Sequence, residues 1–130
     1  MNSFCKAEHL CNKTLFEELI ASKDGFTKYP YRIIFRKSSR QGEYPARFAI
    51  SVSKKKFKHA TDRNRIKRLT REAYRLNKSG LYEVIGTSGT WDILFIYLDN
   101  KIFSWQKIEK AMQESMEKLI RHYHNSYVQE

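Results

Sequence analysis

The chain has 130 residues and a formal net charge of +11 at neutral pH, from 25 Lys and Arg against 14 Asp and Glu. This length, with 41% hydrophobic residues, predicts one hydrophobic core and a single domain over residues 1–130. The longest apolar run, Ile93 to Leu98, is too short to cross a membrane, and Lys6, Glu8 and His9 interrupt any secretory signal. The composition therefore argues against membrane proteins, and its charge favours a polyanionic partner.

The two cysteines, Cys5 and Cys11, suggest no disulfide framework, so we expect a reducing compartment and a cytoplasmic location. The spacing Cys5-x3-His9-x-Cys11 crowds three ligands into one short segment without a fourth, so we expect no metal site there. Residues 1–11 and 125–130 are expected to be flexible ends.

The first predicted helix covers Asn12–Ser22, with Asn12 or Thr14 as its cap and Phe16, Leu19 and Ile20 on its buried side. It ends before Asp24-Gly25. Two strands, Arg32–Lys37 and Ala46–Ser53, follow across a polar loop and are predicted to pair antiparallel.

A basic segment, Ser53–Lys78, holds eleven Lys and Arg against two acids, and so nine of the eleven net positive charges. Its apolar residues recur at helical spacing and predict one packed stripe, formed by Ile66, Leu69, Ala73 and Leu76. Asp62 or Thr61 is the predicted N-cap, and Asn77 with Ser79-Gly80 the stop. A merely solvated basic face is the alternative, but such a face normally carries more acids at i,i+4. The pattern thus favours a nucleic-acid partner.

After the basic helix, the sequence predicts a mobile connection through Gly80, Gly86, Ser88 and Gly89. A central strand over Trp91–Leu98 and a long helix capped by Ser104 are predicted to follow. The apolar stripe of that helix is predicted to be core rather than a partner site: Trp105, Ile108, Met112, Met116, Leu119 and Tyr123.

The basic helix resembles a known family at these residues. The run Arg63-Asn64-Arg65-Ile66-Lys67-Arg68-Leu69, followed by Arg71-Glu72-Ala73, resembles the Arg-Asn-Arg motif of the protein subunit of bacterial ribonuclease P. Ser51-Val52-Ser53-Lys54-Lys55 resembles the strand end that precedes the motif, and the order of elements agrees over nearly the whole chain. The segment Phe57–Asp62 is most similar to members from the Bacteroidetes. One departure is Lys58-His59-Ala60-Thr61, where many members have Gly-x-Ala-Val.

The resemblance implies an α+β sandwich. It has a small, mostly antiparallel central sheet, a left-handed β-α-β crossover through the basic helix, and N- and C-terminal helices. The usual preference for right-handed crossovers would predict the other hand.

The resemblance also implies a division of labour. The protein would bind the ribonuclease P RNA and the 5′ leader of precursor tRNA as a monomer, one protein to one RNA. The RNA subunit, with its bound Mg²⁺, would cleave the leader. No catalytic residue is predicted in the protein, since none of the four histidines is placed with an acid in a recognisable arrangement.

Residues predicted to contact the RNA subunit are Lys54, Lys55, Lys56, Arg63, Asn64, Arg65, Lys67, Arg68, Arg71 and Arg75. In the family the leader lies in a cleft lined partly by aromatic residues, and the matching candidates here are Phe16, Ile20 and Phe35. Phe16 and Phe35 could equally be core residues.

Other functions remain open at this point. A DNA-binding module would usually be a helical bundle or zipper, which this order of elements does not resemble. A ribosomal-type RNA-binding protein has a similar size and charge, and a protein-only nuclease would need activity without RNA.

Overall fold

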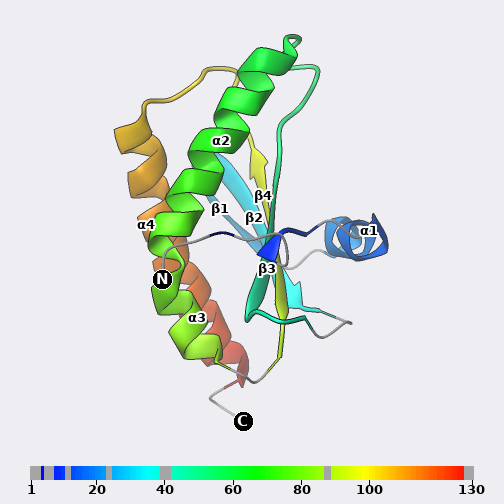
Figure 1. Ribbon diagram of the computed structural model, residues 1–130, viewed down its shortest axis with the longest axis vertical. Helices are drawn as coiled ribbons and strands as arrows, with labels where there is room; N and C mark the ends of the chain where they lie inside the picture. The colour runs from blue at the N-terminus through cyan, green and yellow to red at the C-terminus, as the bar shows by residue number, and fades with distance from the viewer. Residues whose placement is uncertain are drawn as a thin grey trace.

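One sheet with helices on both faces makes up the fold (Figure 1). The computed structural model describes Phe4 and residues 8–10, 13–22, 25–38, 42–86 and 89–127. In chain order the elements are α1 (Lys13–Ala21), β1 (Gly25–Lys28), β2 (Tyr31–Lys37), β3 (Ala46–Ser51), α2 (Ala60–Asn77), α3 (Ser79–Ile85), β4 (Trp91–Tyr97) and α4 (Trp105–Tyr127).

The strands lie in the order β1-β2-β4-β3. The β1–β2 and β2–β4 pairs are antiparallel, whereas β3 and β4 are parallel. The predicted direct pairing of the strands before the basic helix is therefore wrong, because β4 inserts between β2 and β3. Almost all of β4 is buried, so this apolar strand takes the central position. The short β1, which the sequence analysis missed, extends the sheet as a hairpin partner of β2.

The connection from β3 through α2 and α3 to β4 is a β-α-β crossover, and the mostly antiparallel α+β architecture is confirmed. The left-handed sense of that crossover stays a prediction from the resemblance.

Two hydrophobic clusters lie on opposite faces of the sheet. The larger one packs the sheet against α2, α3 and α4, and the smaller one packs it against α1 (Figure 1). Strand alternation assigns the residues: along β2, Ile33 and Phe35 enter the larger cluster, and Ile34 enters the smaller one. In α1, Leu15 and Leu19 are buried, whereas Ile20 is 53% exposed, contrary to its predicted place on the buried side.

Three predicted helix features need correction. The N-cap of α2 is His59, without a side-chain capping bond, rather than Asp62 or Thr61. The predicted mobile connection contains a second helix, α3, which begins immediately after Lys78 and buries Leu81. The last helix begins as predicted, with Ser104 Oγ accepting a hydrogen bond from the Lys107 amide at 3.3 Å, but it continues through Tyr127 into the end expected to be flexible.

The segment 8–10 packs against the sheet. The Leu10 amide donates to the Phe48 carbonyl at 3.0 Å, so the segment lies along the outer edge of β3. Glu8 is 1% exposed; its carboxylate forms an ion pair with Lys78 and accepts a hydrogen bond from Tyr82 at 2.7 Å. Burial raises the pKa of Tyr82, so its hydroxyl stays protonated and donates. This network ties the start of the chain to the junction of α2 and α3.

Across the part of the chain that the structure describes, no helix is both long and apolar enough to cross a bilayer.

Candidate nucleic-acid interface

One side of α2 anchors the helix to the sheet. Its buried residues are Ile66, Thr70, Ala73 and Tyr74. The Tyr74 ring stacks on Phe48 with centroids 4.1 Å apart, and Thr70 Oγ1 lies 2.7 Å from the Tyr31 hydroxyl.

The buried side of α2 is therefore rotated about the helix axis relative to the predicted apolar stripe. Leu69 is half-buried and Leu76 is 38% exposed, whereas Thr70 and Tyr74 are fully buried. The sequence pattern did not predict that Thr70 and Tyr74 are buried, because both carry polar hydroxyl groups. In the structure these hydroxyls have hydrogen-bond partners: Thr70 bonds to the Ile66 carbonyl and to Tyr31, and Tyr74 bonds to Tyr82.

The opposite side of α2 is a cationic surface. Asn64, Arg65, Arg68 and Arg71 are exposed, and Lys67 is half-buried beside them. Among the described residues, these four cations have no acidic partner within salt-bridge distance. Their guanidinium and ammonium donors are thus available to an anion in solution. The cationic side predicted for this helix is therefore present on α2, with three exposed arginines and one half-buried lysine.

Two of the predicted contact residues around α2, Arg63 and Arg75, are engaged within the protein. Arg63 Nη1 donates to the Phe57 carbonyl at 2.7 Å and to the Lys58 carbonyl at 3.1 Å, so it holds the loop that enters α2. Arg75 Nε donates to Glu72 at 3.0 Å, and that hydrogen bond lowers the pKa of Glu72.

The three lysines before α2 are exposed at the end of β3. Lys56 Nζ donates to the Leu98 carbonyl, which brings this loop to the end of β4. A hollow of about 470 Å³ lies there, lined by Lys55, Lys56, Leu98, Asp99 and Asn100.

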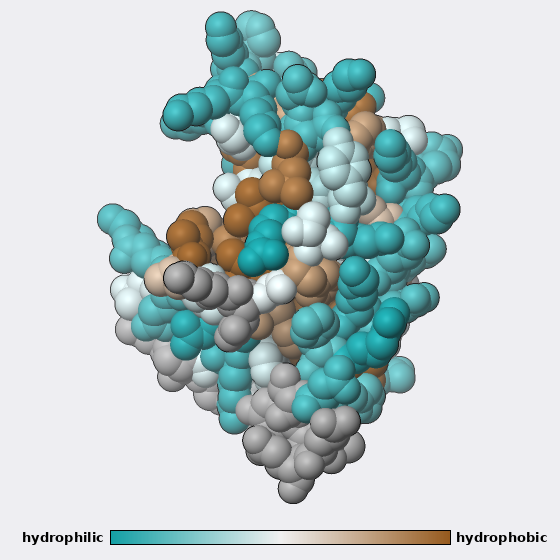
Figure 2. All heavy atoms as spheres, turned by 180° about the vertical axis from the view of Figure 1, so that it is seen from behind, coloured by the Kyte–Doolittle hydropathy of each residue, from teal (hydrophilic) through white to brown (hydrophobic). Residues whose placement is uncertain are grey.

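The α1 face of the sheet carries a second surface. Phe16, Ala49 and Ile96 are only partly buried, and Ile20 is exposed nearby on α1. Arg32, which pairs with Ile96 across the β2–β4 ladder, lies half-buried on the same face. Figure 2 shows a hollow in this side of the molecule with hydrophobic residues along its wall. Hydrophobic side chains and a cation therefore occur together on a face that α1 covers only in part.

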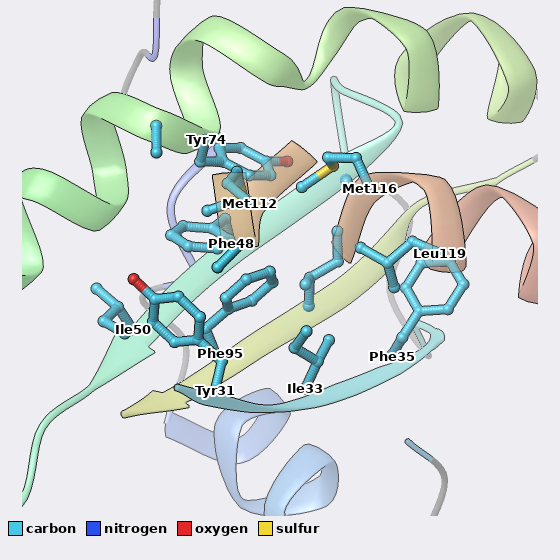
Figure 3. Packing of buried hydrophobic residues seen from close by; sticks show 14 of the residues in the cluster. Tyr31, Ile33, Phe35, Phe48, Ile50, Tyr74, Phe95, Met112, Met116 and Leu119 are labelled. Atoms are coloured by element: carbon cyan, nitrogen blue, oxygen red, sulfur yellow. The ribbon is translucent and has the colours of Figure 1, made fainter. Parts of the chain in front are cut away.

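Phe35 does not belong to that surface. It is 8% exposed and stacks on Trp91 with centroids 4.4 Å apart, on the opposite face of the sheet from Phe16. Figure 3 shows it among core side chains, next to Leu119. The prediction that Phe16 and Phe35 line one cleft is wrong, because Phe35 alternates to the helix-covered side.

Within the described residues no group of three or more His, Cys, Asp or Glu side chains is placed to hold a metal ion. Cys5 and Cys11 lie outside those residues.

Sequence reasoning missed Arg32, Phe4 and His9 as surface residues. Arg32 could have been found from the alternation of Arg32, Ile34 and Arg36 along one strand. No sequence signal places Phe4 and His9 beside α2, because that depends on how segment 8–10 packs along the edge of β3.

The fold and the charges of α2 together define a small basic α+β protein. Its crossover helix, α2, exposes cations that could bind a polyanion. The model of the family described as Ribonuclease P matches residues 4–120. The chain is 34% identical to the ribonuclease P protein component of Porphyromonas gingivalis strain ATCC 33277 over 112 residues, covering 85% of this chain and 82% of that protein. It is 30% identical to the component of Pseudoalteromonas atlantica, covering 88% and 97% of the two chains. The chain therefore belongs to the ribonuclease P protein family.

Solved structures agree in fold. The ribonuclease P protein of Staphylococcus aureus superposes with a TM-score of 0.69 at 22% identity, covering 88% of this chain and 96% of that one. The protein from Thermotoga maritima gives a TM-score of 0.57 at 25% identity, covering 82% and 89%.

Proposed function

We propose that this chain binds the RNA subunit of ribonuclease P through the outer side of α2. The observation that carries the proposal is a set of cations on that side that have no acidic partner among the described residues: the exposed Arg65, Arg68 and Arg71 and the half-buried Lys67. Each cation set against a phosphate releases a condensed counterion, and Asn64 adds a directional amide. Arg63 supports this surface by holding the loop that enters α2. Family membership favours this partner over ribosomal RNA.

The 5′ leader of precursor tRNA lies, in this proposal, on the uncovered part of the α1 face. Phe16 and Ile20 offer apolar contact to unstacked bases, while Arg32 and the lysines at 54–56 neutralise phosphates along the same side. Such contacts do not read sequence, which suits a protein that meets many different leaders.

Cleavage itself is assigned to the RNA subunit and its Mg²⁺. The protein's part is positioning: it neutralises phosphates of both RNAs and so lowers their mutual repulsion. We further propose that it acts in the cytoplasm, as a monomer bound to one RNA.

Reconstitution tests this function. The purified chain, mixed with a bacterial ribonuclease P RNA and a precursor tRNA at low Mg²⁺, should restore cleavage at the mature 5′ end, and neither component alone should do so at that Mg²⁺ concentration. Cleavage by the chain after complete removal of RNA would instead make it a protein-only nuclease.

The α2 surface has its own test. Replacing Arg65, Arg68 and Arg71 together by Ala should weaken binding of the RNA subunit and lower the slope of log affinity against log salt by roughly two. A matched control removes three exposed cations elsewhere, Lys101, Lys110 and Arg121. Equal losses in the two folded variants would show that only net charge matters and would refute the assignment.

The leader site is tested by Phe16→Ala. This change should weaken binding of precursor tRNA to the holoenzyme about five-fold to a hundredfold, from a stacking loss of about 1–3 kcal/mol, and leave mature tRNA binding nearly unchanged. Equal losses for both tRNAs would remove Phe16 from the leader site.

A further inference from the structure

A groove lies between the N-terminal segment and the cationic side of α2. Its volume is about 510 Å³, within the range of roughly 300–1,000 Å³ that small-molecule sites occupy. Its lining combines two rings with four cations or amides and one acid: Phe4, His9, Asn64, Arg68, Arg71, Glu72 and Arg75.

The rings form a fixed platform. Phe4 and His9 stack with centroids 4.0 Å apart, and Phe4 also meets Tyr74 and Phe48 edge-on at 5.4 and 6.1 Å. His9 is held in addition by its bridge to Phe48 on the edge of β3. His9 is half-buried, so part of its ring lines the open groove. Because the platform is in place before any ligand arrives, binding costs it little conformational entropy.

The charges beside the platform favour an anion. Glu72, the one acid in the lining, is engaged by Arg75, whereas Arg68 and Arg71 have no acidic partner among the described residues. Burial and the nearby Arg71 lower the pKa of His9 from its ordinary value of 6.5, although Glu8 and a hydrogen bond to the Phe4 backbone oppose this. The lowered pKa favours the uncharged form of the His9 ring, which lines the groove.

We propose that this groove binds one unpaired nucleotide of the RNA subunit, with its base stacked on His9 and its phosphate held by Arg68 and Arg71. This inference rests on the proposed function and adds a specific site to it. A single-stranded nucleotide fits better than a duplex, since bases inside a duplex cannot reach a ring platform. Asn64 at the groove provides an amide that can hydrogen-bond the edge of the base.

The test compares two substitutions of similar size at one position. His9→Leu keeps apolar contact with Phe4 but removes the aromatic face, whereas His9→Phe keeps that face. Affinity of each folded chain for the ribonuclease P RNA is measured over a range of salt concentrations, with Lys110→Ala as a control on α4.

We expect His9→Leu to bind about five-fold or more weakly with an unchanged salt slope, and His9→Phe to bind within about two-fold of the parent chain. Arg71→Ala should weaken binding and also lower the slope by about 0.7–0.9, as loss of one phosphate contact requires. The control should match the parent chain in affinity within about two-fold.

Two results would overturn the site: a folded His9→Leu that binds as tightly as the parent, or a His9→Phe that binds as weakly as His9→Leu. Failure of the parent chain itself to bind the RNA would refute the proposed function instead.

Discussion

The buried ion pair between Glu8 and Lys78 yields a sharp prediction about stability. Both side chains are almost inaccessible, at 1% and 6% exposed, although 70 positions separate them in the chain. Replacing Glu8 by Ala leaves the Lys78 ammonium buried between the Phe4 and Tyr82 rings, 5.6 and 5.1 Å from their centroids. It also removes the carboxylate that accepts a hydrogen bond from the Tyr82 hydroxyl at 2.7 Å.

The expected cost follows from that geometry. A buried charge that loses its partner costs about 3–5 kcal/mol, a large part of the roughly 5–15 kcal/mol that stabilises a typical domain. The lost hydrogen bond of the Tyr82 hydroxyl adds less to this cost, because that hydroxyl also lies 2.9 Å from the Tyr74 hydroxyl. At about 3–6 °C per kcal/mol for a chain of this size, Tm should fall by roughly 10–25 °C.

Thermal and urea unfolding, followed by circular dichroism, measure the effect. The matched control is the double variant Glu8→Leu/Lys78→Met, which replaces the pair by apolar groups and should recover most of the loss. Two results would refute the reasoning. One is a free energy of unfolding for Glu8→Ala within about 1 kcal/mol of the parent value, and the other is a double variant no more stable than Glu8→Ala.

Three further results are expected. Phe35→Ala should lower the free energy of unfolding by about 3–5 kcal/mol and reduce all RNA-binding activities together, since its ring is core; a stable variant that loses only leader binding would reverse this assignment. Leu69→Asp should cost less than Ile66→Asp in urea unfolding, because Leu69 is half-buried and Ile66 is 1% exposed. By NMR, His9 should titrate below its ordinary pKa of 6.5, and Arg71→Ala should raise that pKa. Because the pKa of His9 is lower in the folded state, the contribution of His9 to the free energy of unfolding is complete above about pH 6.5 and is lost as the pH falls. A His9→Gln variant should lack this part of the pH dependence.

The sequence was sufficient to predict the elements whose signals are local. The alternation of Phe48 and Ile50 and the stripe from Ile108 to Leu119 predict β3 and α4, and all of these side chains are buried. The Arg-Asn-Arg motif predicts α2 and its charged side, since charge density needs no knowledge of tertiary contacts.

The errors arise where burial depends on a distant partner. Thr70 has the sequence pattern of a surface residue until Tyr31 is placed opposite its hydroxyl. Glu8 and Lys78 resemble ordinary surface charges until segment 8–10 is placed along the edge of β3. Likewise, Phe35 looks as suitable for a cleft as Phe16, because one strand position alone does not say which face the helices cover.

The central place of β4 has a consequence for how the chain is made. During synthesis β2 and β3 leave the ribosome well before β4, yet each pairs in the sheet with β4 rather than with the other. A nascent chain that ends before Trp91 thus carries its cationic helix with no completed sheet to pack on, and both strand edges stay unsatisfied. Emergence of the last strand supplies the missing partner of both β2 and β3 at once, so the sheet is completed late in translation.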